Sequence, residues 1–566
     1  MEKNRKKLLF FAVFSLLTFA KMFAGSNDKG IEYFRAELYD AAKIFFLQQT
    51  NQSATEQAEN YYYLGHTYYQ LNQEDSASYY YKKATEVSPE YPFGYVGLGK
   101  LEFKKGNIKA ADDLFKKANS YAKKNPAVQT AIAEVYIDAG DYNNAIIALD
   151  RARKVNSKYS GIYVAEGDML MKQGKVGDAC GRYDNAIFFD KTDKLAYLKS
   201  ALFYKGVSIS TALDYLDRLV AIDPDYIPAY AIIGEIHKDA GRYQKALDAY
   251  EKFISVPGIP MQQYEYYTQL LFFTNQYEKA LDQIKYVLSK NPDNLIMKRL
   301  EAYNSFRLEN YTLGLEQMNN FLEILERERH IYQDYTTLGR LATKEKQPLL
   351  ALEALQKAIE LDSARAATEE IYNEMAAIAV SAGMYPEAVD YYEKHLVIKD
   401  SPDANDFNNY AKAAYSAAAY YITPGNFASV TTPEAIAAFE SDFKNYVQKS
   451  DNAYAEVIKR RPEMYYGYVG RANVNSLLDK YDIDRTEKMQ GYAKPFFEEA
   501  IQVLLNSNSD GSKNKMIIDA YRYLASYYFA VENNTPAIIE YNKKILDIDP
   551  NDEKAKETLK VLKVKY

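Results

Sequence analysis

A repeat of about 34 residues runs through most of this chain of 566 residues, and it restricts the fold more than any other feature. Gly65, Gly99, Gly167 and Gly234 are separated by 34, 68 and 67 residues, and similar residues accompany each glycine. Within residues 58–91, small, apolar and aromatic residues recur at helical spacing in two blocks, and a proline follows the second block. The pattern consists of Tyr61, Leu64, Gly65 and Tyr68, followed by Ala77, Tyr81, Ala84 and Pro89. One helix pair cannot bury its apolar face alone, so the pattern predicts an all-α solenoid of stacked pairs.

These residues, at positions 4, 7, 8, 11, 20, 24, 27 and 32 of the repeat, resemble the tetratricopeptide repeat (TPR) signature. The resemblance implies a right-handed superhelix of about 14 helix–turn–helix units. We expect about 11 repeats in residues 26–401, with a weak one at 295–331 that is the expected position of a flexible joint. About three more are expected in residues 402–551, two of them with insertions, at 422–433 and 478–492. Residues 552–566 are predicted to form a charged capping helix.

Residues 1–25 have the composition of a secretory signal peptide. A basic start precedes an apolar run, residues 8–20, that is too short to span a membrane, and no cysteine follows it to carry a lipid anchor. Cys180 is the only cysteine, which fits a bacterial periplasm better than a disulfide-rich eukaryotic exterior. The richness in Tyr, Asn and Lys is similar to that of exported TPR proteins of Bacteroidota-type bacteria. We therefore expect a soluble, periplasmic mature chain without a transmembrane segment, and a retained signal anchor is the alternative.

The sequence contains no recognisable catalytic, cofactor or metal motif. The four histidines lie in distant repeats without a second His or Cys at ligand spacing, so no metal is expected. Cys180 has no histidine near it in sequence, and residues 94–100 lack the strand and the spacing of a phosphate loop. The net charge of −7 is spread over interspersed signs without a basic stripe, so nucleic acid is not an expected partner. We predict that the chain is not an enzyme and needs no cofactor.

The resemblance places positions 2, 5, 9, 12 and 13 of each first helix on the concave face of the superhelix. In the early repeats these positions form an apolar band flanked by acidic residues, and further on they are aromatic and basic. The predicted partner-binding residues are Phe93, Val96, Phe103, Ile137, Val164, Met171, Phe272, Arg299, Tyr303, Phe306, Arg307, Arg340 and Lys344. Apolar surface rimmed by charge suits a protein or peptide segment. The alternative is that superhelical coiling buries some of these side chains against neighbouring turns.

The predicted function is a non-catalytic scaffold or adaptor that binds a partner protein or peptide along this groove in the cell envelope. No Lys–Asn pair occurs at positions 5 and 9, so the carboxylate clamp of TPR co-chaperones is not expected. One alternative is a structural subunit of an envelope complex, and another is an enzyme or glycan-handling accessory with a site near 402–514. Joint charge reversal of Arg299, Arg307 and Arg340 is expected to weaken partner capture without unfolding the chain.

Overall fold

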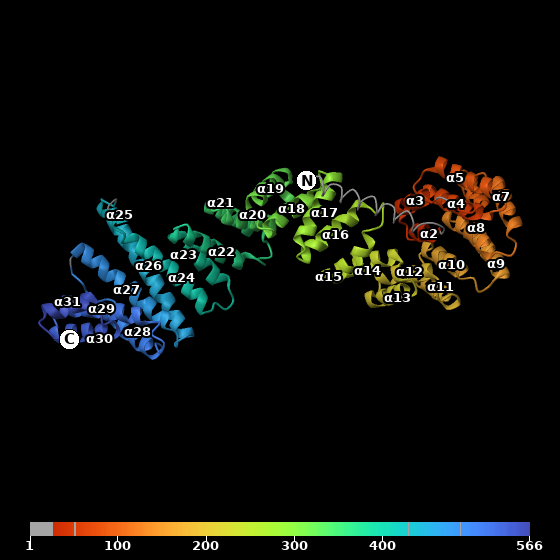
Figure 1. Ribbon diagram of the computed structural model, residues 1–566. Helices are drawn as coiled ribbons and strands as arrows, with labels where there is room; N and C mark the ends of the chain where they lie inside the picture. Colours follow the sequence, from red (N-terminus) through yellow and green to blue (C-terminus); the bar gives the residue numbers. More distant parts are fainter. Residues whose placement is uncertain (1–26, 50–51, 428–429, 487, 566) are drawn as a thin grey trace, which may run out of the picture. The chain divides into compact units, whose positions relative to one another are not determined.

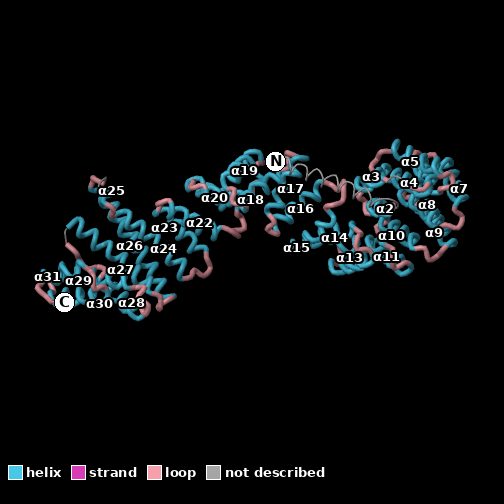
Figure 2. The backbone as a smooth tube through the Cα atoms, viewed as in Figure 1, coloured by secondary structure: helices cyan, strands magenta, loops and turns pink. Residues whose placement is uncertain are grey.

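The computed structural model describes residues 27–49, 52–427, 430–486 and 488–565. The chain divides into two compact units, Met1–Met297 and Lys298–Tyr566, within helix α18 (Leu295–Arg307) (Figure 1). In the described ranges it consists of α-helices and a short 3₁₀ turn, with no β-strand (Figure 2). The predicted all-α repeat solenoid is confirmed. The predicted signal peptide lies outside the described residues, as do residues 428–429 and 487 of the two insertions.

Unit 1 contains the most regular repeats, in which first and second helices alternate along the chain. Its helices are α2 (Asp28–Arg35), α3 (Tyr39–Gln48), α4 (Ala54–Gln70), α5 (Glu74–Val87), α6 (Pro92–Lys104), α7 (Ile108–Tyr121), α8 (Pro126–Asp138), α9 (Tyr142–Val155), α10 (Ser160–Lys172), α11 (Val176–Phe189), α12 (Lys194–Lys205), α13 (Ile209–Ile222), α14 (Ile227–Asp239), α15 (Tyr243–Phe253), α16 (Met261–Phe273) and α17 (Tyr277–Lys290).

A left-handed residue ends the first helix of most repeats. Such residues recur 34 positions apart at Asn72, Gly106, Gly140 and Gly174, with φ of 60°, 81°, 77° and 73°. After α6, the N–H of Asn107 donates to the carbonyl of Glu102 at 2.9 Å, which satisfies a carbonyl at the end of the helix. Because glycine and asparagine tolerate positive φ best, the turn chemistry agrees with the helix pattern.

The aromatic residue at position 24 fills the space that glycines leave in the first helices on both sides of it. A Cβ atom on Gly65 would lie 2.7 Å from the ring of the fully buried Tyr81, and one on Gly97 only 2.3 Å from it. Gly167 stands in the same relation to Tyr183, at 2.3 Å. The small residues are therefore required by the close packing of these rings.

Ion pairs join the first helices of successive repeats in unit 1. Lys100 of α6 and Lys172 of α10 both contact Asp138 of α8, at 2.8 and 2.7 Å. Lys205 of α12 contacts Glu235 of α14 at 2.6 Å. Lys100 is only 3% exposed but Asp138 is 40% exposed, so their pair is only partly desolvated, and the other two pairs are near the surface and contribute little to stability.

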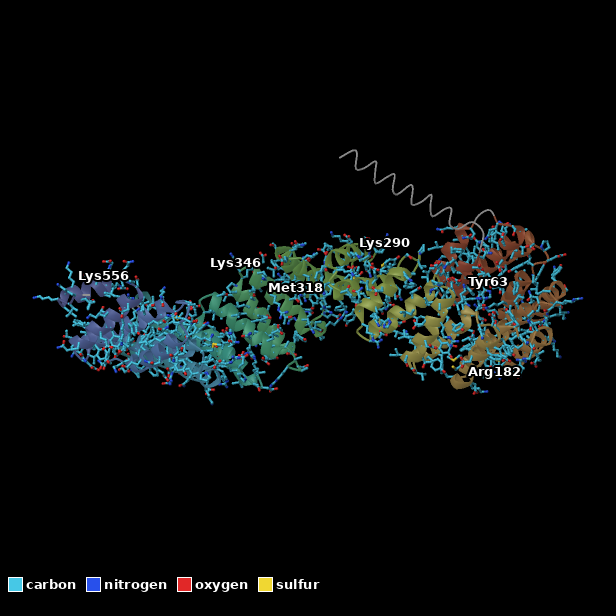
Figure 3. The ribbon with its side chains drawn as sticks, turned by 60° about the horizontal axis from the view of Figure 1, so that its bottom comes forward. Tyr63, Arg182, Lys290, Met318, Lys346 and Lys556 are labelled. Atoms are coloured by element: carbon cyan, nitrogen blue, oxygen red, sulfur yellow. The ribbon has the colours of Figure 1, made fainter. Side chains whose placement is uncertain are left out.

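Unit 2 begins in the repeat that looks weak in sequence, yet this repeat also forms a helix pair. The left-handed residue of its turn is Glu309, and the next one is Lys346, labelled in Figure 3, which lies 37 positions later. The three residues beyond the usual 34 are accommodated by the segment around η1, before α20. The elements that follow α18 are α19 (Tyr311–Ile324), η1 (Arg327–Arg329), α20 (Tyr332–Lys344), α21 (Pro348–Leu361), α22 (Thr368–Ser381), α23 (Tyr385–Ile398), α24 (Ala404–Tyr421), α25 (Pro424–Phe427), α26 (Pro433–Arg460), α27 (Tyr465–Thr486), α28 (Lys494–Asn506), α29 (Asn514–Ala530), α30 (Thr535–Ile548) and α31 (Glu553–Val561).

Each predicted insertion is next to a long helix: α26 has 28 residues and α27 has 22. Most of the described part of the second insertion is helical, since α27 continues to Thr486. The added turns pack together around Ile422, Phe443, Leu477 and Tyr481, and the rings of Phe443 and Tyr481 stack at 4.9 Å. The lengthened helices thus bury a hydrophobic cluster of their own.

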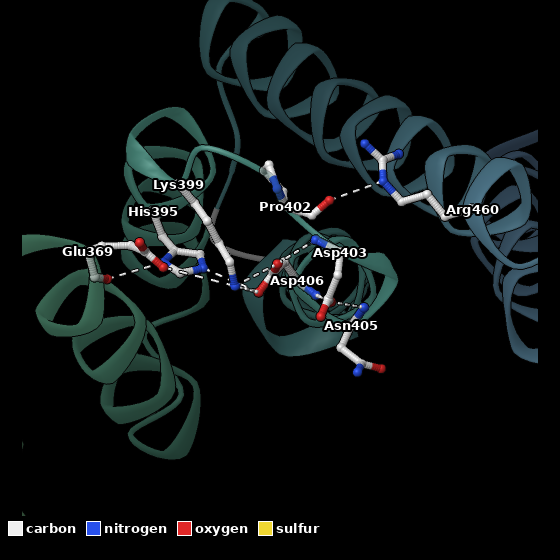
Figure 4. A network of polar contacts seen from close by, with 8 residues as sticks. All are labelled: Glu369, His395, Lys399, Pro402, Asp403, Asn405, Asp406 and Arg460. Carbon is white, nitrogen blue, oxygen red and sulfur yellow. Dashed lines mark hydrogen bonds and ion pairs between the residues drawn. The ribbon is translucent and has the colours of Figure 1, made fainter.

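A polar network joins α22, α23 and α24 (Figure 4). The buried His395 contacts the Glu369 carbonyl at 3.1 Å and an Asp406 oxygen at 3.4 Å. Lys399 donates to Asp406 at 3.0 Å, and the backbone N–H of Asp403 donates to it at 2.7 Å. Burial alone would raise the pKa of Asp406, but these hydrogen bonds outweigh it and lower the pKa. The network therefore fixes the junction between two repeats.

Candidate interaction surfaces

Three residues of the predicted groove belong to the core of unit 1 instead. Val96, Ile137 and Val164 are only 1%, 3% and 5% exposed and pack among apolar residues of neighbouring helices. They cannot contact a partner while the repeats are folded, so the prediction that they line an open groove is wrong. The physical reason is that successive first helices pack against one another, which closes the seams where these side chains lie.

The other predicted residues of unit 1 keep some accessible surface. Phe93 and Phe103 are half-buried, and each ring lies against a tyrosine, at 5.5 and 5.3 Å between centroids. Met171 is 39% exposed, and Phe272 is half-buried. Their contact with a partner stays a prediction.

Helix α2 pairs with α3 and also contacts the first helices α4 and α12 of unit 1, where the sequence predicts an open groove (Figure 1). The Phe34 ring lies 5.8 Å from the ring of Tyr63, which Figure 3 labels, in α4. Lys194 at the start of α12 donates to the carboxylate of Glu32. Helix α2 is the first helix of a pair with α3, and no sequence signal indicates that it also contacts α12.

The predicted basic residues of unit 2 are largely neutralised by acids of the next repeat. Arg299 donates to Asp334 at 3.0 Å, and this carboxylate is fully buried and also accepts the Tyr303 hydroxyl at 2.7 Å. Arg340 donates through Nε and Nη2 to Glu374, at 3.1 and 2.5 Å. Arg299 and Arg340 are thus parts of the fold, which corrects the expectation that they form a free basic set.

Phe306, Arg307 and Lys344 remain as candidate contacts of unit 2. The Phe306 ring lies 6.0 Å from the ring of Tyr311, and the Lys344 ammonium lies 5.6 Å from the centroid of that same ring. Arg307 is exposed. Contact of these three side chains with a partner stays a prediction.

A cleft of about 630 Å³ lies between the segment around η1 and helices α20 and α21. Its volume falls within the range of roughly 300–1,000 Å³ that is usual for ligand pockets. The side chains that line it are apolar (Leu338, Leu350, Ala354, Leu361), polar or aromatic (His330, Tyr335, Gln356) and charged (Arg327, Glu353, Lys357, Glu360). The three residues by which the 295–331 repeat exceeds 34 lie in the segment around η1, beside the cleft. No sequence signal singles out the cleft, because the next turn residue, Gly383, also lies 37 positions after Lys346.

His330 forms one wall of the cleft and is held in place by two contacts. One ring nitrogen lies 2.9 Å from the Tyr335 hydroxyl, and the other lies 3.1 Å from the Leu325 carbonyl. Both contacts involve groups beside the η1 segment, so this wall is fixed by the fold.

The described residues contain no group of three or more His, Cys, Asp or Glu side chains that could hold a metal ion. Burial raises the pKa of the Cys180 thiol, which makes it a poor nucleophile.

In the 402–514 stretch, a cavity between α27, α28 and α29 has only about 60 Å³, well below the usual pocket size. Asp479 of α27 does not line this cavity; it is buried and accepts hydrogen bonds from the backbone N–H groups of residues 490–493 and from the Tyr523 hydroxyl. No helix in the described ranges has the length and apolar character needed to cross a membrane.

Comparison with known families matches the tetratricopeptide repeat at three places. One family model covers residues 102–165, and a second covers residues 58–91 and 227–257. Together with the repeat geometry, these matches define an all-α repeat solenoid. The chain contains tetratricopeptide repeats at these places.

Two curated relatives are TPR repeat-containing proteins. YpiA of Bacillus subtilis (strain 168) is 21% identical over 179 residues, which is 31% of this chain and 42% of the relative. MJ1428 of Methanocaldococcus jannaschii is 22% identical over 268 residues, which is 47% of this chain and 37% of the relative. The chain thus spans about two fifths of the length of these relatives.

Solved structures give weaker likenesses. The C-terminal part of a TPR repeat-containing protein from Cytophaga hutchinsonii is 22% identical, with a TM-score of 0.36, and covers 52% of this chain and 99% of that chain. The APC/C hetero-tetramer Cut9–Hcn1 is 13% identical, with a TM-score of 0.24, and covers 89% of this chain and 96% of that chain. At these TM-scores, neither structure informs the function of this chain.

Proposed function

We propose that this chain is a protein-interaction scaffold of the cell envelope, and that a partner segment binds the cleft of unit 2. The observation that carries the proposal is the cleft of about 630 Å³ with its apolar wall and charged rim. Such a combination suits a short protein segment that buries one or two apolar side chains and places polar groups at the edge. The TPR family assignment supports a binding role, and the composition of residues 1–25 supports export.

Leu350 and Leu349 provide a matched pair for the test. Leu350 lines the cleft, whereas its neighbour Leu349 is 71% exposed and does not line it. A photoreactive phenylalanine analogue at Gln356 of the full chain, expressed in its native cells, should crosslink one partner. Leu350→Arg should reduce this crosslink at least about tenfold, which corresponds to about 1.4 kcal/mol, while Leu349→Arg should leave it unchanged.

Two controls decide between outcomes. Circular dichroism of both leucine variants checks that they are folded. An equal crosslink from the photoreactive analogue placed at Val397, which is 84% exposed on α23, would contradict a specific site in the cleft.

Cell fractionation tests the location, and a chain that stays in the cytoplasm would refute the envelope part of the proposal. Co-purification in fixed stoichiometry would favour a structural subunit over a reversible adaptor.

A further inference from the structure

Helices α2 and α3 form the first helix pair of unit 1, which is built like the pairs that follow. A Cβ atom on Gly30 of α2 would lie 2.5 Å from the rings of Phe45 and Phe46 of α3, so the two helices approach closely. The turn between them contains a left-handed residue, Glu37, with φ of 62°. Both phenylalanines also pack in one cluster with Leu64 of α4. The pair therefore begins the solenoid, and its contacts with the second pair follow from the repeat.

The same pair also contacts the sixth, seventh and eighth pairs (α12–α13, α14–α15 and α16–α17), and α2 provides the polar half of this closing contact. Lys194 of α12 donates to Glu32 of α2, and it also contacts Asp223 at 2.9 Å. Lys29 of α2 donates to the backbone carbonyl of Asp225, between α13 and α14. Glu32 is 7% exposed, and Lys29 lies 3.8 Å from it. Loss of Lys194 would therefore leave a buried carboxylate with only this longer contact.

Helix α3 provides the apolar half of the closing contact, against the connection between α15 and α16. Val256 and Ile259 of this connection are only 2% and 6% exposed, and they share one hydrophobic cluster with Ala41 of α3. Gly258 has φ of 79°, and a Cβ atom on it would lie 3.1 Å from the α3 backbone. The close approach of the two segments therefore requires glycine at this position.

The α15–α16 connection departs from the repeat in a way that suits this contact. The second helices α5, α7, α9, α11 and α13 each have 14 residues, whereas α15 has 11. The connections 156–159 and 190–193 are short and mostly polar, whereas residues 254–260 read Ile-Ser-Val-Pro-Gly-Ile-Pro. Apolar side chains in a connection are unfavourable in water, and α3 covers those of this one. The departure thus supplies a surface for the first pair.

We propose that the closing contact is a lock, which holds unit 1 at a fixed curvature and makes the pairs from α2 to α17 open together. An open solenoid loses its terminal repeats first, because each repeat contacts only its neighbours. In unit 1 the first pair also holds the sixth to eighth pairs, so the loss of either half of the contact loosens the other half. The lock does not involve the cleft of unit 2, so the two proposals can fail independently.

The first test weakens the polar half in the full chain and measures the apolar half by native-state hydrogen exchange. Lys194→Met removes the charge that faces Glu32 and keeps an unbranched side chain. The matched control, Lys199→Met on the same helix, removes an ion pair with Asp168 at 3.2 Å that is not part of the closing contact. Lys194→Met should lower the protection of the α3 and α16 amides at least about tenfold, and the control should change it less than about twofold.

The second test weakens the apolar half and measures the polar half. Ala41→Glu places a charge against the α15–α16 connection, and Leu47→Glu, at a position of α3 that is 51% exposed, is the control. Ala41→Glu should lower the protection of α12 and α14 at least about tenfold, and this expectation holds even if the first pair unfolds, because the contact is then lost as well. A fall confined to α3 would overturn the proposal, as would unchanged α3 protection in Lys194→Met.

The curvature is tested by the distance between two spin labels, at Gln48→Cys in α3 and Lys285→Cys in α17. Both positions are exposed, and Cys180→Ala in every sample prevents a third label. The chain with Lys194 should give one narrow distance distribution, and Lys194→Met should add a longer distance. Identical distributions in both chains would refute the fixed curvature.

Discussion

Tyr81 and Tyr183 occupy the same position of two repeats, yet replacement by phenylalanine should have opposite effects on stability. Tyr81 is fully buried, and its hydroxyl has no hydrogen-bond partner among the residues that the structure describes. Tyr183 is 2% exposed, and its hydroxyl donates to an Asp168 oxygen at 2.7 Å. Phenylalanine preserves both rings, which fill the space beside glycines, so the variants differ only in the loss of the hydroxyl group.

The expected magnitudes follow from the hydrogen bonds. A buried hydroxyl without a partner costs about 1–3 kcal/mol, so Tyr81→Phe should raise the local stability by about 1 kcal/mol. Tyr183→Phe loses a hydrogen bond to a charged group, which is worth about 1.5–3 kcal/mol. Asp168 is partly exposed and also pairs with Lys199 at 3.2 Å, so the lower end of that range, about 1.5 kcal/mol, is expected.

Native-state hydrogen exchange of the full chain is the suitable assay, because a long repeat array opens in parts rather than as one unit. The opening free energies of α5 and α11 report on the two sites separately. A destabilisation of α5 by more than about 0.5 kcal/mol in Tyr81→Phe would refute the reasoning, because it would mean that the hydroxyl has a partner after all. A change of the same sign in both variants would refute it as well.

Two further predictions concern the backbone and the buried charges. Gly258→Ala should destabilise the contact between α3 and the α15–α16 connection by more than the roughly 1–2 kcal/mol that positive φ costs, because its Cβ would lie 3.1 Å from the α3 backbone. Gly241→Ala, with positive φ and nothing within 4 Å, is the control, and hydrogen exchange of α3 is the measurement. Arg299→Met should cost about 3–5 kcal/mol, because it leaves the buried Asp334 carboxylate unpaired. Arg307→Met should change the stability by less than about 0.5 kcal/mol, and equal thermal shifts for these two arginine variants would contradict the argument.

The sequence predicts the contacts between neighbouring helices much better than those between distant ones. The packing of Tyr81 against Gly65 follows from residues within one repeat, and helical periodicity alone indicates it. The pair Glu32–Lys194 joins residues 162 positions apart, and no periodic signal relates them. Val96 was misassigned for a different reason, because its burial depends on how closely successive first helices approach, which the repeat period does not determine.

The departures from the 34-residue period differ in what they do to the surface. The described parts of the two insertions are next to the long helices α26 and α27, which bury a hydrophobic cluster between them. The insertions therefore add little accessible apolar surface. The three extra residues before α20, in contrast, coincide with the cleft. The rim of the cleft carries two bases and two acids, and Lys357 pairs with Glu360 at 2.7 Å, so a partner meets a largely balanced charge there. Binding in the cleft should then depend on shape and apolar contact, and its affinity should change little between low and physiological salt.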